Sequence, residues 1–265
     1  MSSETESSPL ATAFSCAVSA ASFQIPAWRP YITAWAAHGP FMLWLFDALR
    51  PSSFVELGTH YGYSFFTGCQ GVRDSNLSTQ CTAVDTWRGD EQAGRYGEEV
   101  YAAVRQQAER YRGFAHLKRM TFDEALGDFP EGSIDLLHID GRHFYEDVLH
   151  DWTTWKSKVS PQGVVLFHDT KVMDKGFGVY KFWAEVRHSY PSFEFFHQHG
   201  LGVLGFGKDQ RPGMQRFFSA TRDAAVAEHI RIIYTRLGNA LPAFSHAGPA
   251  TTPQRFRTTF QFGQK

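Results

Sequence analysis

The chain has 265 residues, of which 43% are hydrophobic and 20% are charged, and its formal net charge at pH 7 is −1. This length allows one sizeable domain with extensions, but it is too short for two large domains. The balanced charge does not indicate a nucleic-acid-binding surface, so we expect no nucleic-acid partner.

The N-terminal segment and the cysteines bear on the compartment. Residues 1–30 carry acids where a signal peptide would carry Lys or Arg, and no long apolar run that could span a membrane follows. Cys16, Cys69 and Cys81 form no CxxC pair, which favours a reducing compartment. We therefore expect a cytoplasmic protein with a loosely ordered leader over residues 1–30 and no membrane partner, and we leave a homo-oligomer open.

Short apolar runs alternate with helix-like stretches along most of the chain. We expect strands at 53–57, 81–85, 116–120, 134–140 and 163–169, and helices at 34–50, 98–111, 122–129 and 144–159. This alternation predicts an α/β fold of βαβ units, in which a parallel sheet is covered on both faces. Beyond residue 169 we expect a helix at 178–190 and then two strands, at 192–200 and 201–207, that close one edge of the sheet.

The run FVELGTHYGYSFF (54–66) reads as a buried strand that ends in a glycine turn. Gly58 and Gly62 can adopt backbone angles closed to other residues and let a ligand approach the main chain. Their spacing is GxxxG and not GxGxxG, which disfavours pyrophosphate. Glu56 would repel a phosphate and suits a cationic ligand group.

Asp85 ends the next expected strand, where a carboxylate can accept both hydroxyls of a ribose. Together with Glu56 and the two glycines, Asp85 indicates a nucleoside that has a cationic tail and no phosphate. S-adenosylmethionine (SAM) fits this description. The alternative is an ordinary tight turn with a solvated Asp.

Several of these segments resemble one enzyme family. VELGTHYGYS (55–64) is similar to the first motif of class I SAM-dependent methyltransferases, and above all to the acid–Leu–Gly–x–x–x–Gly–Tyr–Ser run of catechol-type O-methyltransferases. AVDTW (83–87), the segment 133–155 and GVVLFHDT (163–170) resemble bacterial O-methyltransferases of sugars and natural products. The resemblance implies a Rossmann-like sheet of seven mostly parallel strands with the last strand antiparallel, and helices on both faces.

The expected organisation follows from these patterns. We expect the leader at 1–30, a SAM-dependent methyltransferase domain at 31–210, a C-terminal helical extension at 211–240 and an irregular tail at 241–265. We also assign Thr59, Ser64, Thr86, Trp87, Phe122 and Asp140 to the cofactor site. Trp87 would cover the adenine, with plain packing as the alternative, and the role of Phe122 at the adenine edge is implied by the resemblance.

The segments HIDGRH and FHD place ionisable side chains at neighbouring strand ends. Asp140 and His143 follow one expected strand, and His168 and Asp169 end the next. His143 is the natural general base, because its ordinary pKa lies near the operating pH, and Asp140 is assigned with it to catalysis. The alternative for His143 is a structural histidine that hydrogen-bonds the backbone.

A divalent cation such as Mg²⁺ or Mn²⁺ is left open at the same strand ends. Metal-dependent members of the family use acids at the places of Asp140, His168 and Asp169. A histidine in this set departs from the all-oxygen ligands that Mg²⁺ prefers, and it suits Mn²⁺, Fe²⁺ or Zn²⁺ better, or no metal.

The segment RGDEQAGRYGEEVYAAVRQQ (88–107) would be a lid or an acceptor wall, or simply a polar crossover. We interpret the chain as a SAM-dependent O-methyltransferase that acts on a hydroxyl of a sugar, a glycan or a glycosylated natural product, so the expected partner is a small-molecule or glycan acceptor. Two alternatives remain open at this point, a metal-dependent hydroxylase of the same fold and a catalytically silent SAM-binding scaffold.

Overall fold

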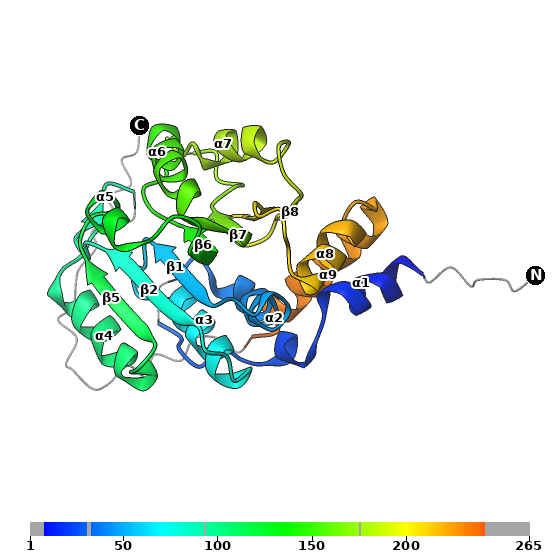
Figure 1. Ribbon diagram of the computed structural model, residues 1–265, viewed down its shortest axis with the longest axis horizontal. Coiled ribbons are helices and arrows are strands. Elements are labelled where there is room, and N and C mark those ends of the chain that lie inside the picture. Colours follow the sequence, from blue (N-terminus) through cyan, green and yellow to red (C-terminus); the bar gives the residue numbers. More distant parts are fainter. Residues whose placement is uncertain (1–7, 31–32, 93, 175, 242–265) are drawn as a thin grey trace, which may run out of the picture.

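The computed structural model of the chain describes residues 8–30, 33–92, 94–174 and 176–241. Its centre is a seven-stranded sheet with the strand order β5-β2-β1-β6-β7-β9-β8 (Figure 1). In that order the strands are β5 (Ala115–Arg119), β2 (Gln80–Asp85), β1 (Ser53–Leu57), β6 (Ile134–Ile139), β7 (Val159–His168), β9 (Leu201–Gly205) and β8 (Ser192–Phe195).

The directions of the strands confirm the expected fold class. From β5 to β7 every neighbouring pair is parallel, whereas β9 runs antiparallel to both β7 and β8. The last strand in the sequence is therefore the antiparallel one. It lies one place in from the edge, and β8 forms the edge itself.

Helices cover both faces of this sheet, as expected. They are α1 (Pro9–Ala17), α2 (Gly39–Leu49), α3 (Tyr63–Asp74), α4 (Glu98–Ala108), α5 (Phe122–Ala125), α6 (Tyr145–Trp155), α7 (Val179–Val186), α8 (Pro212–Ala220) and α9 (Ala224–Asn239). Figure 1 shows α6 and α7 on one side of the strands and α2 and α3 on the other. Short 3₁₀ turns lie at Ala20–Phe23, Ala36–His38, Glu109–Tyr111, Leu126–Asp128 and Lys156–Lys158.

Alternation along the strands builds two separate cores. Phe54 of β1 packs in a core shared with α1–α4, α8 and α9, while its neighbour Val55 packs in a core shared with α5–α7. Leu136 and Leu137 of β6 divide in the same way. This is the pattern of strands that are buried on both faces, since successive side chains point to opposite sides.

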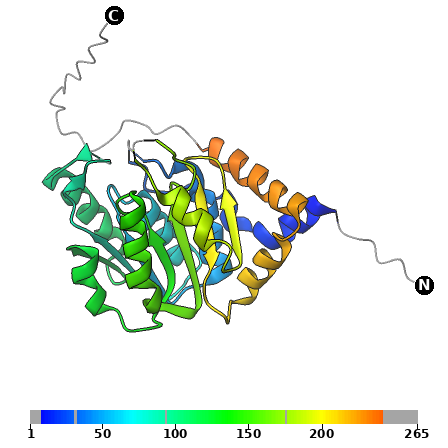
Figure 2. The same ribbon diagram turned by 90° about the horizontal axis from the view of Figure 1, so that it is seen from above.

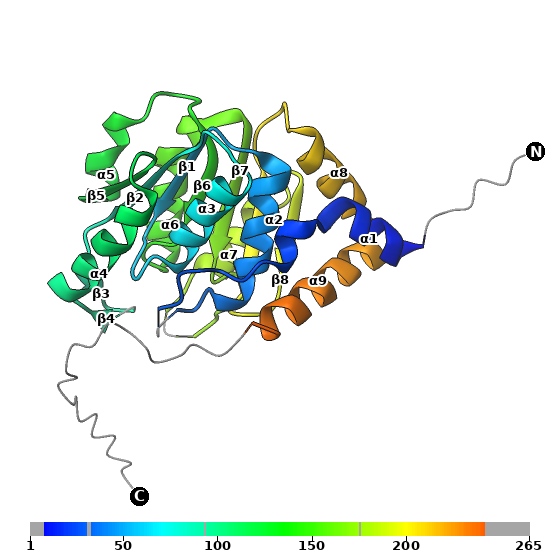
Figure 3. The same ribbon diagram turned by 90° about the horizontal axis from the view of Figure 1, so that it is seen from below.

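The expectation of a loosely ordered leader is wrong for the described part of residues 1–30. Ser8 caps α1 by accepting a hydrogen bond from the Ala11 amide, and Pro9 stands at the first helical position. Ala13 and Ala17 are fully buried, and α1 lies along α9 and α8 (Figures 2 and 3). The small alanine side chains let α1 approach α9 and α8 closely. The mixed composition of the segment does not indicate this packing.

The C-terminal helical extension matches α8 and α9, whereas the tail expected at 241–265 lies almost wholly outside the described residues. Among the described helices, none combines the length and the apolar character that a membrane-spanning helix needs.

Candidate active site

A cavity of about 510 Å³ opens at the carboxyl ends of β1, β2, β6 and β7. Four segments that follow these strands supply most of its wall, and the chain before α2 and the loop after β8 close it. The lining residues that the argument uses are Thr33, Trp35, Gly58, Thr59, His60, Gly62, Ser64, Asp85, Thr86, Asp90, Gln92, Tyr96, Phe122, Asp140, Gly141, Arg142, His143, His168, Asp169, Phe177 and His199. Parallel strands deliver these groups to one rim because their carboxyl ends coincide.

The turn after β1 forms one side of the cavity. Gly58 and Gly62 have φ values of 87° and 74°, a region that favours glycine. A side chain at Gly58 would collide with the backbone carbonyl of Asp140, and one at Gly62 would meet the Phe66 ring. The two glycines therefore allow close contact within the protein, and the turn exposes its backbone to the cavity.

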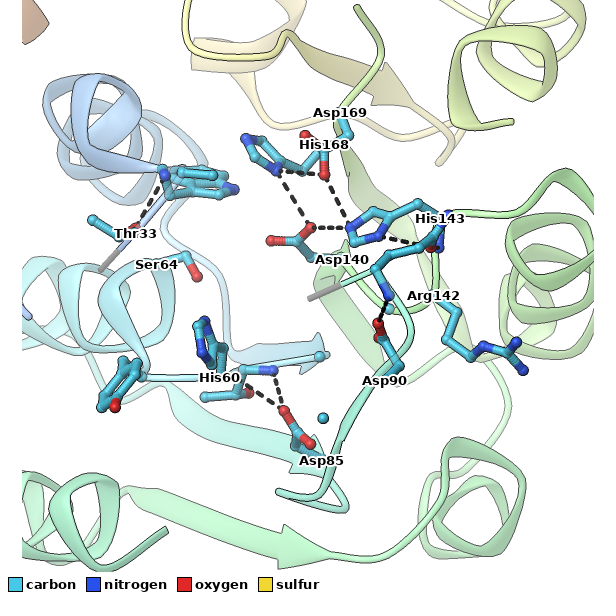
Figure 4. A pocket seen from close by; sticks show the side chains of 18 of the residues that line it. Thr33, His60, Ser64, Asp85, Asp90, Asp140, Arg142, His143, His168 and Asp169 are labelled. Atoms are coloured by element: carbon cyan, nitrogen blue, oxygen red, sulfur yellow. Dashed lines mark hydrogen bonds and ion pairs between the residues drawn. The ribbon is translucent and has the colours of Figure 1, made fainter. Parts of the chain in front are cut away.

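Asp85 binds this turn directly. Its Oδ2 accepts hydrogen bonds from the backbone amides of Thr59 and His60, both at 2.9 Å, and its Oδ1 accepts one from the Trp87 amide at 2.7 Å. A carboxylate has about four acceptor positions, so these three backbone bonds do not exhaust the capacity of Asp85, and the Tyr96 side chain is its other polar neighbour. Asp85 thus has two positions to serve. It holds the turn after β1, and it lines the cavity in which a ribose is expected (Figure 4).

Glu56 does not line the cavity. It is fully buried, and its Oε2 lies 2.8 Å from Nδ1 of His138 on the neighbouring strand. Burial raises the pKa of Glu56, and the hydrogen bond from His138 opposes that rise. The other ring nitrogen of His138 lies 3.9 Å from Oδ2 of Asp140. Glu56, which the sequence pattern matched to a cationic ligand group, is thus connected to the cavity through the buried His138.

Trp87 is likewise absent from the cavity wall. Its side chain is fully buried, and its Nε1 donates to the carbonyl oxygen of His60 at 3.0 Å. The packing alternative therefore holds for Trp87, because its ring lies among core residues and supports the turn from within. Thr59, Ser64, Thr86 and Phe122 line the cavity. The Thr59 hydroxyl is buried and has no hydrogen-bond partner among the described residues.

The opposite side of the cavity holds a cluster of two carboxylates and two imidazoles (Figure 4). Nε2 of His143 lies 2.9 Å from Oδ2 of Asp169 and 3.8 Å from Oδ1 of Asp140. Nδ1 of His168 lies 3.3 Å from each of the same two carboxylate oxygens. Asp169 adopts a left-handed backbone conformation with φ of 61°, which a short polar side chain tolerates.

The cluster is electrically balanced, and this balance shifts the pKa of each member. Burial alone would lower the pKa of both histidines, but Asp140 and Asp169 raise the pKa of His143 to about 9 and that of His168 to about 10. Burial alone would raise the pKa of both carboxyls, but His168 and His143 hold it well below its ordinary value. In this arrangement both imidazoles carry protons near neutral pH.

Three of these side chains could hold a metal ion. One donor atom each from Asp140, His143 and Asp169 lies within 4.8 Å of the others. The sequence pattern instead places His168, not His143, beside Asp140 and Asp169 in the metal-ligand set. His168 is close to both carboxylates, but it is 2% exposed, whereas His143 stands on the rim. The donor set of two carboxylates and an imidazole fits a transition metal better than Mg²⁺.

Several cavity residues were not assigned to the site from the sequence. Trp35, Tyr96 and Phe177 supply aromatic surface, and His199 approaches Oδ1 of Asp169 at 3.2 Å. Neither Trp35 nor Phe177 stands at the end of an expected strand, where the candidate site residues were sought. The segment 88–107 does contribute a wall, through Gly89, Asp90, Gln92 and Tyr96.

A sheet of this order, with a glycine turn after its central strand and a cavity at the carboxyl strand ends, defines the class I methyltransferase fold. Residues 55–170 match a family model described as a methyltransferase domain.

Several known proteins are similar to this chain in sequence or in fold. The uncharacterized protein y4gI of Sinorhizobium fredii is 54% identical over 182 residues, which are 69% of this chain and 20% of that protein. The chain thus spans about a fifth of the length of that relative. Cofactor-bound Rv0187 from MTB has a TM-score of 0.51 at 13% identity, covering 77% of this chain and 93% of the other. A Klebsiella pneumoniae protein regarded as an O-methyltransferase has a TM-score of 0.50 at 13% identity, covering 75% and 88%. These two structures share the fold.

Proposed function

We propose that this chain is a SAM-dependent O-methyltransferase that acts on a hydroxyl group of a sugar, a glycan or a glycosylated natural product. The observation that carries the proposal is the division of one cavity into two chemically different halves. The glycine turn and Asp85 form one half, and the Asp140–His143–Asp169 cluster forms the other.

The first half fits SAM. The turn offers backbone groups, Asp85 offers a carboxylate, and the unpaired Thr59 hydroxyl and Ser64 are polar groups in the same wall. Phe122 adds an apolar surface for a base. These residues would hold the cofactor, which supplies an electrophilic methyl group on a sulfonium sulfur.

The second half fits an acceptor hydroxyl. His143 Nε2 would take the proton that the hydroxyl loses as its oxygen forms the new bond to carbon. Asp169 and Asp140 would hold the imidazole in place and stabilise the charge that it gains. A divalent cation between these carboxylates would lower the pKa of a bound hydroxyl.

The acceptor class rests on the surface around this cluster. The aromatic residues Trp35 and Phe177 line the cavity, and Asp140, Asp169 and His199 add polar groups to the same wall. Sugars are commonly bound by this combination, because their ring C–H groups contact aromatic faces while their hydroxyls hydrogen-bond. The resemblance of the motif segments to sugar O-methyltransferases supports the same class.

The test is direct transfer of a labelled methyl group. The protein is incubated with methyl-labelled SAM and a panel of free sugars, nucleotide sugars, glycosides and catechols, with and without Mn²⁺. A thermal-shift series with SAM, S-adenosylhomocysteine and NAD runs in parallel. We expect both sulfur nucleosides, but not NAD, to raise the melting temperature, and label to appear on a sugar hydroxyl. Stabilisation by NAD alone would contradict the cofactor, and transfer only to catechols would contradict the acceptor class.

A further inference from the structure

A small hairpin reaches across the cavity to the catalytic histidine. It is formed by β3 (Gly89–Asp90) and β4 (Gly94–Arg95), and Gln92 lies in its turn. The Gln92 side-chain oxygen Oε1 lies 2.8 Å from the backbone nitrogen of His143 and 3.1 Å from its ring nitrogen Nδ1. One side-chain atom therefore contacts both the backbone and the imidazole of the same residue.

The backbone contact fixes the orientation of the amide. A backbone N–H can only donate a hydrogen bond, so the Gln92 atom that faces it must be the oxygen and not the nitrogen. The same oxygen then faces Nδ1 of His143, so Nδ1 must carry a hydrogen. The remaining ring nitrogen, Nε2, faces Oδ2 of Asp169 at 2.9 Å.

Two acceptors therefore compete for the ring hydrogen of a neutral His143. The charged carboxylate of Asp169 would by itself draw that hydrogen to Nε2, because hydrogen bonds to charged groups are the stronger ones. An imidazole with its hydrogen on Nε2 has no lone pair there to accept a proton or bind a metal. The Gln92 oxygen gives the hydrogen on Nδ1 a fixed acceptor, so Nε2, which faces Oδ2 of Asp169, is the nitrogen that gains and loses the exchangeable proton.

The surroundings of Gln92 agree with a fixed position. Its backbone amide donates to Oδ1 of Asp90 at 2.7 Å. The ring of His143 stacks on Phe177 with centroids 4.4 Å apart and planes 11° from parallel. Phe177 thus fixes the plane of the His143 ring, and Gln92 determines which of the two ring nitrogens keeps its hydrogen.

We propose that Gln92 is a positioning residue that holds His143 in the tautomer with the hydrogen on Nδ1, so that Nε2 serves as the reactive nitrogen. This inference rests on the proposed function for its catalytic meaning. Partners that orient a histidine in this way typically affect metal affinity or activity by about 10–100-fold when they are replaced.

The test compares two substitutions at one position. Gln92→Met keeps the approximate length of the side chain and removes the acceptor, whereas Gln92→Glu keeps an acceptor oxygen. Glu91→Gln is the matched control, because Glu91 is the neighbouring hairpin residue and its exposed side chain contacts Arg142 at 3.5 Å. Thermal melting and S-adenosylhomocysteine binding check that each variant is folded.

The first readout is the Nδ1–H resonance of His143 in ¹⁵N-labelled protein, identified by its loss in His143→Gln. We expect a slowly exchanging signal in the wild type, in Gln92→Glu and in Glu91→Gln, and its loss in Gln92→Met. The second readout is kcat, which we expect to fall about 10–100-fold in Gln92→Met and to stay unchanged in Glu91→Gln.

An unchanged resonance and kcat in Gln92→Met would overturn the inference. An equal loss of kcat in Glu91→Gln would also overturn it, because the effect would then belong to the hairpin as a whole. Failure of the proposed function looks different, since the wild type would then transfer no methyl group while the resonance would still report the tautomer.

Discussion

Nε2 of His143 lies 2.9 Å from Oδ2 of Asp169, although the two residues belong to loops after different strands. The register of β6 against β7 brings these loops together, because Ile139 pairs with Phe167 at the ends of the two strands. An imidazole held this close to a carboxylate is a stronger base than a free one, and it is protonated over a wider range of pH. This pairing leads to two predictions about catalysis.

His143→Ala should lower kcat by about 10²–10⁴, the usual contribution of a general base, while the affinity for SAM stays near that of the wild type. His143→Gln should not restore the rate, since glutamine cannot take the proton. Steady-state kinetics combined with calorimetric titration of SAM measure both effects. A variant that keeps nearly normal kcat with and without added metal would return His143 to a purely structural role.

The dependence of the reaction rate on pH should also report the titration of His143. The pKa of His143 is raised to about 9, so without added metal the fraction with an unprotonated Nε2 increases as the pH rises toward that value. The wild-type rate should therefore climb through this range and level off above it. In His143→Gln that rise should be absent. A profile that is identical in both proteins would contradict the assignment of the base.

A shared cation should make activity sensitive to chelation. Asp140, His143 and Asp169 supply three donor atoms within 4.8 Å of one another, and one of these atoms is an imidazole nitrogen. We expect exhaustive EDTA treatment to lower kcat, and Mn²⁺ to restore it better than Mg²⁺. Asp169→Asn should weaken Mn²⁺ binding, and Asp174→Asn, an exposed acid in the same loop, should not. Full activity after EDTA, with the metal content measured as negligible, would reject a catalytic cation.

Asp85 should matter both to the cofactor and to the turn. Asp85→Ala removes the carboxylate acceptor for a ribose, which should weaken SAM binding by on the order of 1.5–3 kcal/mol. It also leaves the amides of Thr59, His60 and Trp87 without their acceptor, so the melting temperature should fall as well. Calorimetry below the new melting temperature separates the two effects. Equal affinity of the folded variant and the wild type would remove Asp85 from the cofactor site.

The fold was largely predictable, because its signals are local. Apolar runs such as IDLLHI and VVLF, separated by amphipathic stretches, specify a parallel sheet buried on both faces. The N-terminal helix was not predictable in this way. Its buried face consists of Ala13, Cys16 and Ala17, which are small residues whose contribution depends on the partner helices α8 and α9.

Site residues at the ends of strands could be predicted from the sequence, whereas the direction of each side chain and the contacts from distant loops could not. Asp85, Asp140, His143 and Asp169 are close to motifs, and all of them line the cavity. Glu56 and Trp87 have the right residue types in the right motifs, but their side chains point to partners inside the protein. Which way a side chain turns depends on residues distant in sequence, such as His138 for Glu56. The contact of Gln92 with His143 spans 51 positions and has no local signal.

The final prediction concerns a buried acid behind the cavity wall. Asp151 on α6 is 6% exposed, and its Oδ2 would lie 3.2 Å from a side chain built at Gly141, which lines the cavity. Burial raises the pKa of Asp151 to about 7. The carboxyl group of Asp151 thus binds its proton more tightly in the folded protein than in the unfolded chain, where the pKa of an ordinary Asp is about 3.9.

The sign of the pH effect follows from that difference. The stability that this carboxyl contributes is fully present below about pH 4 and is lost as the pH rises through about 7, because folding then requires a charged buried group. Asp151→Asn removes the cost and should stabilise the protein above pH 7 by on the order of 1–3 kcal/mol. Each kcal/mol corresponds to roughly 2–4 °C in melting temperature for a chain of this size. The difference in stability between variant and wild type should shrink toward zero near pH 4.

Melting curves from pH 4 to 9 measure this difference, with Glu146→Gln on the exposed face of α6 as the control. A gain that is independent of pH, or equal in the control, would show that Asp151 is not the titrating group.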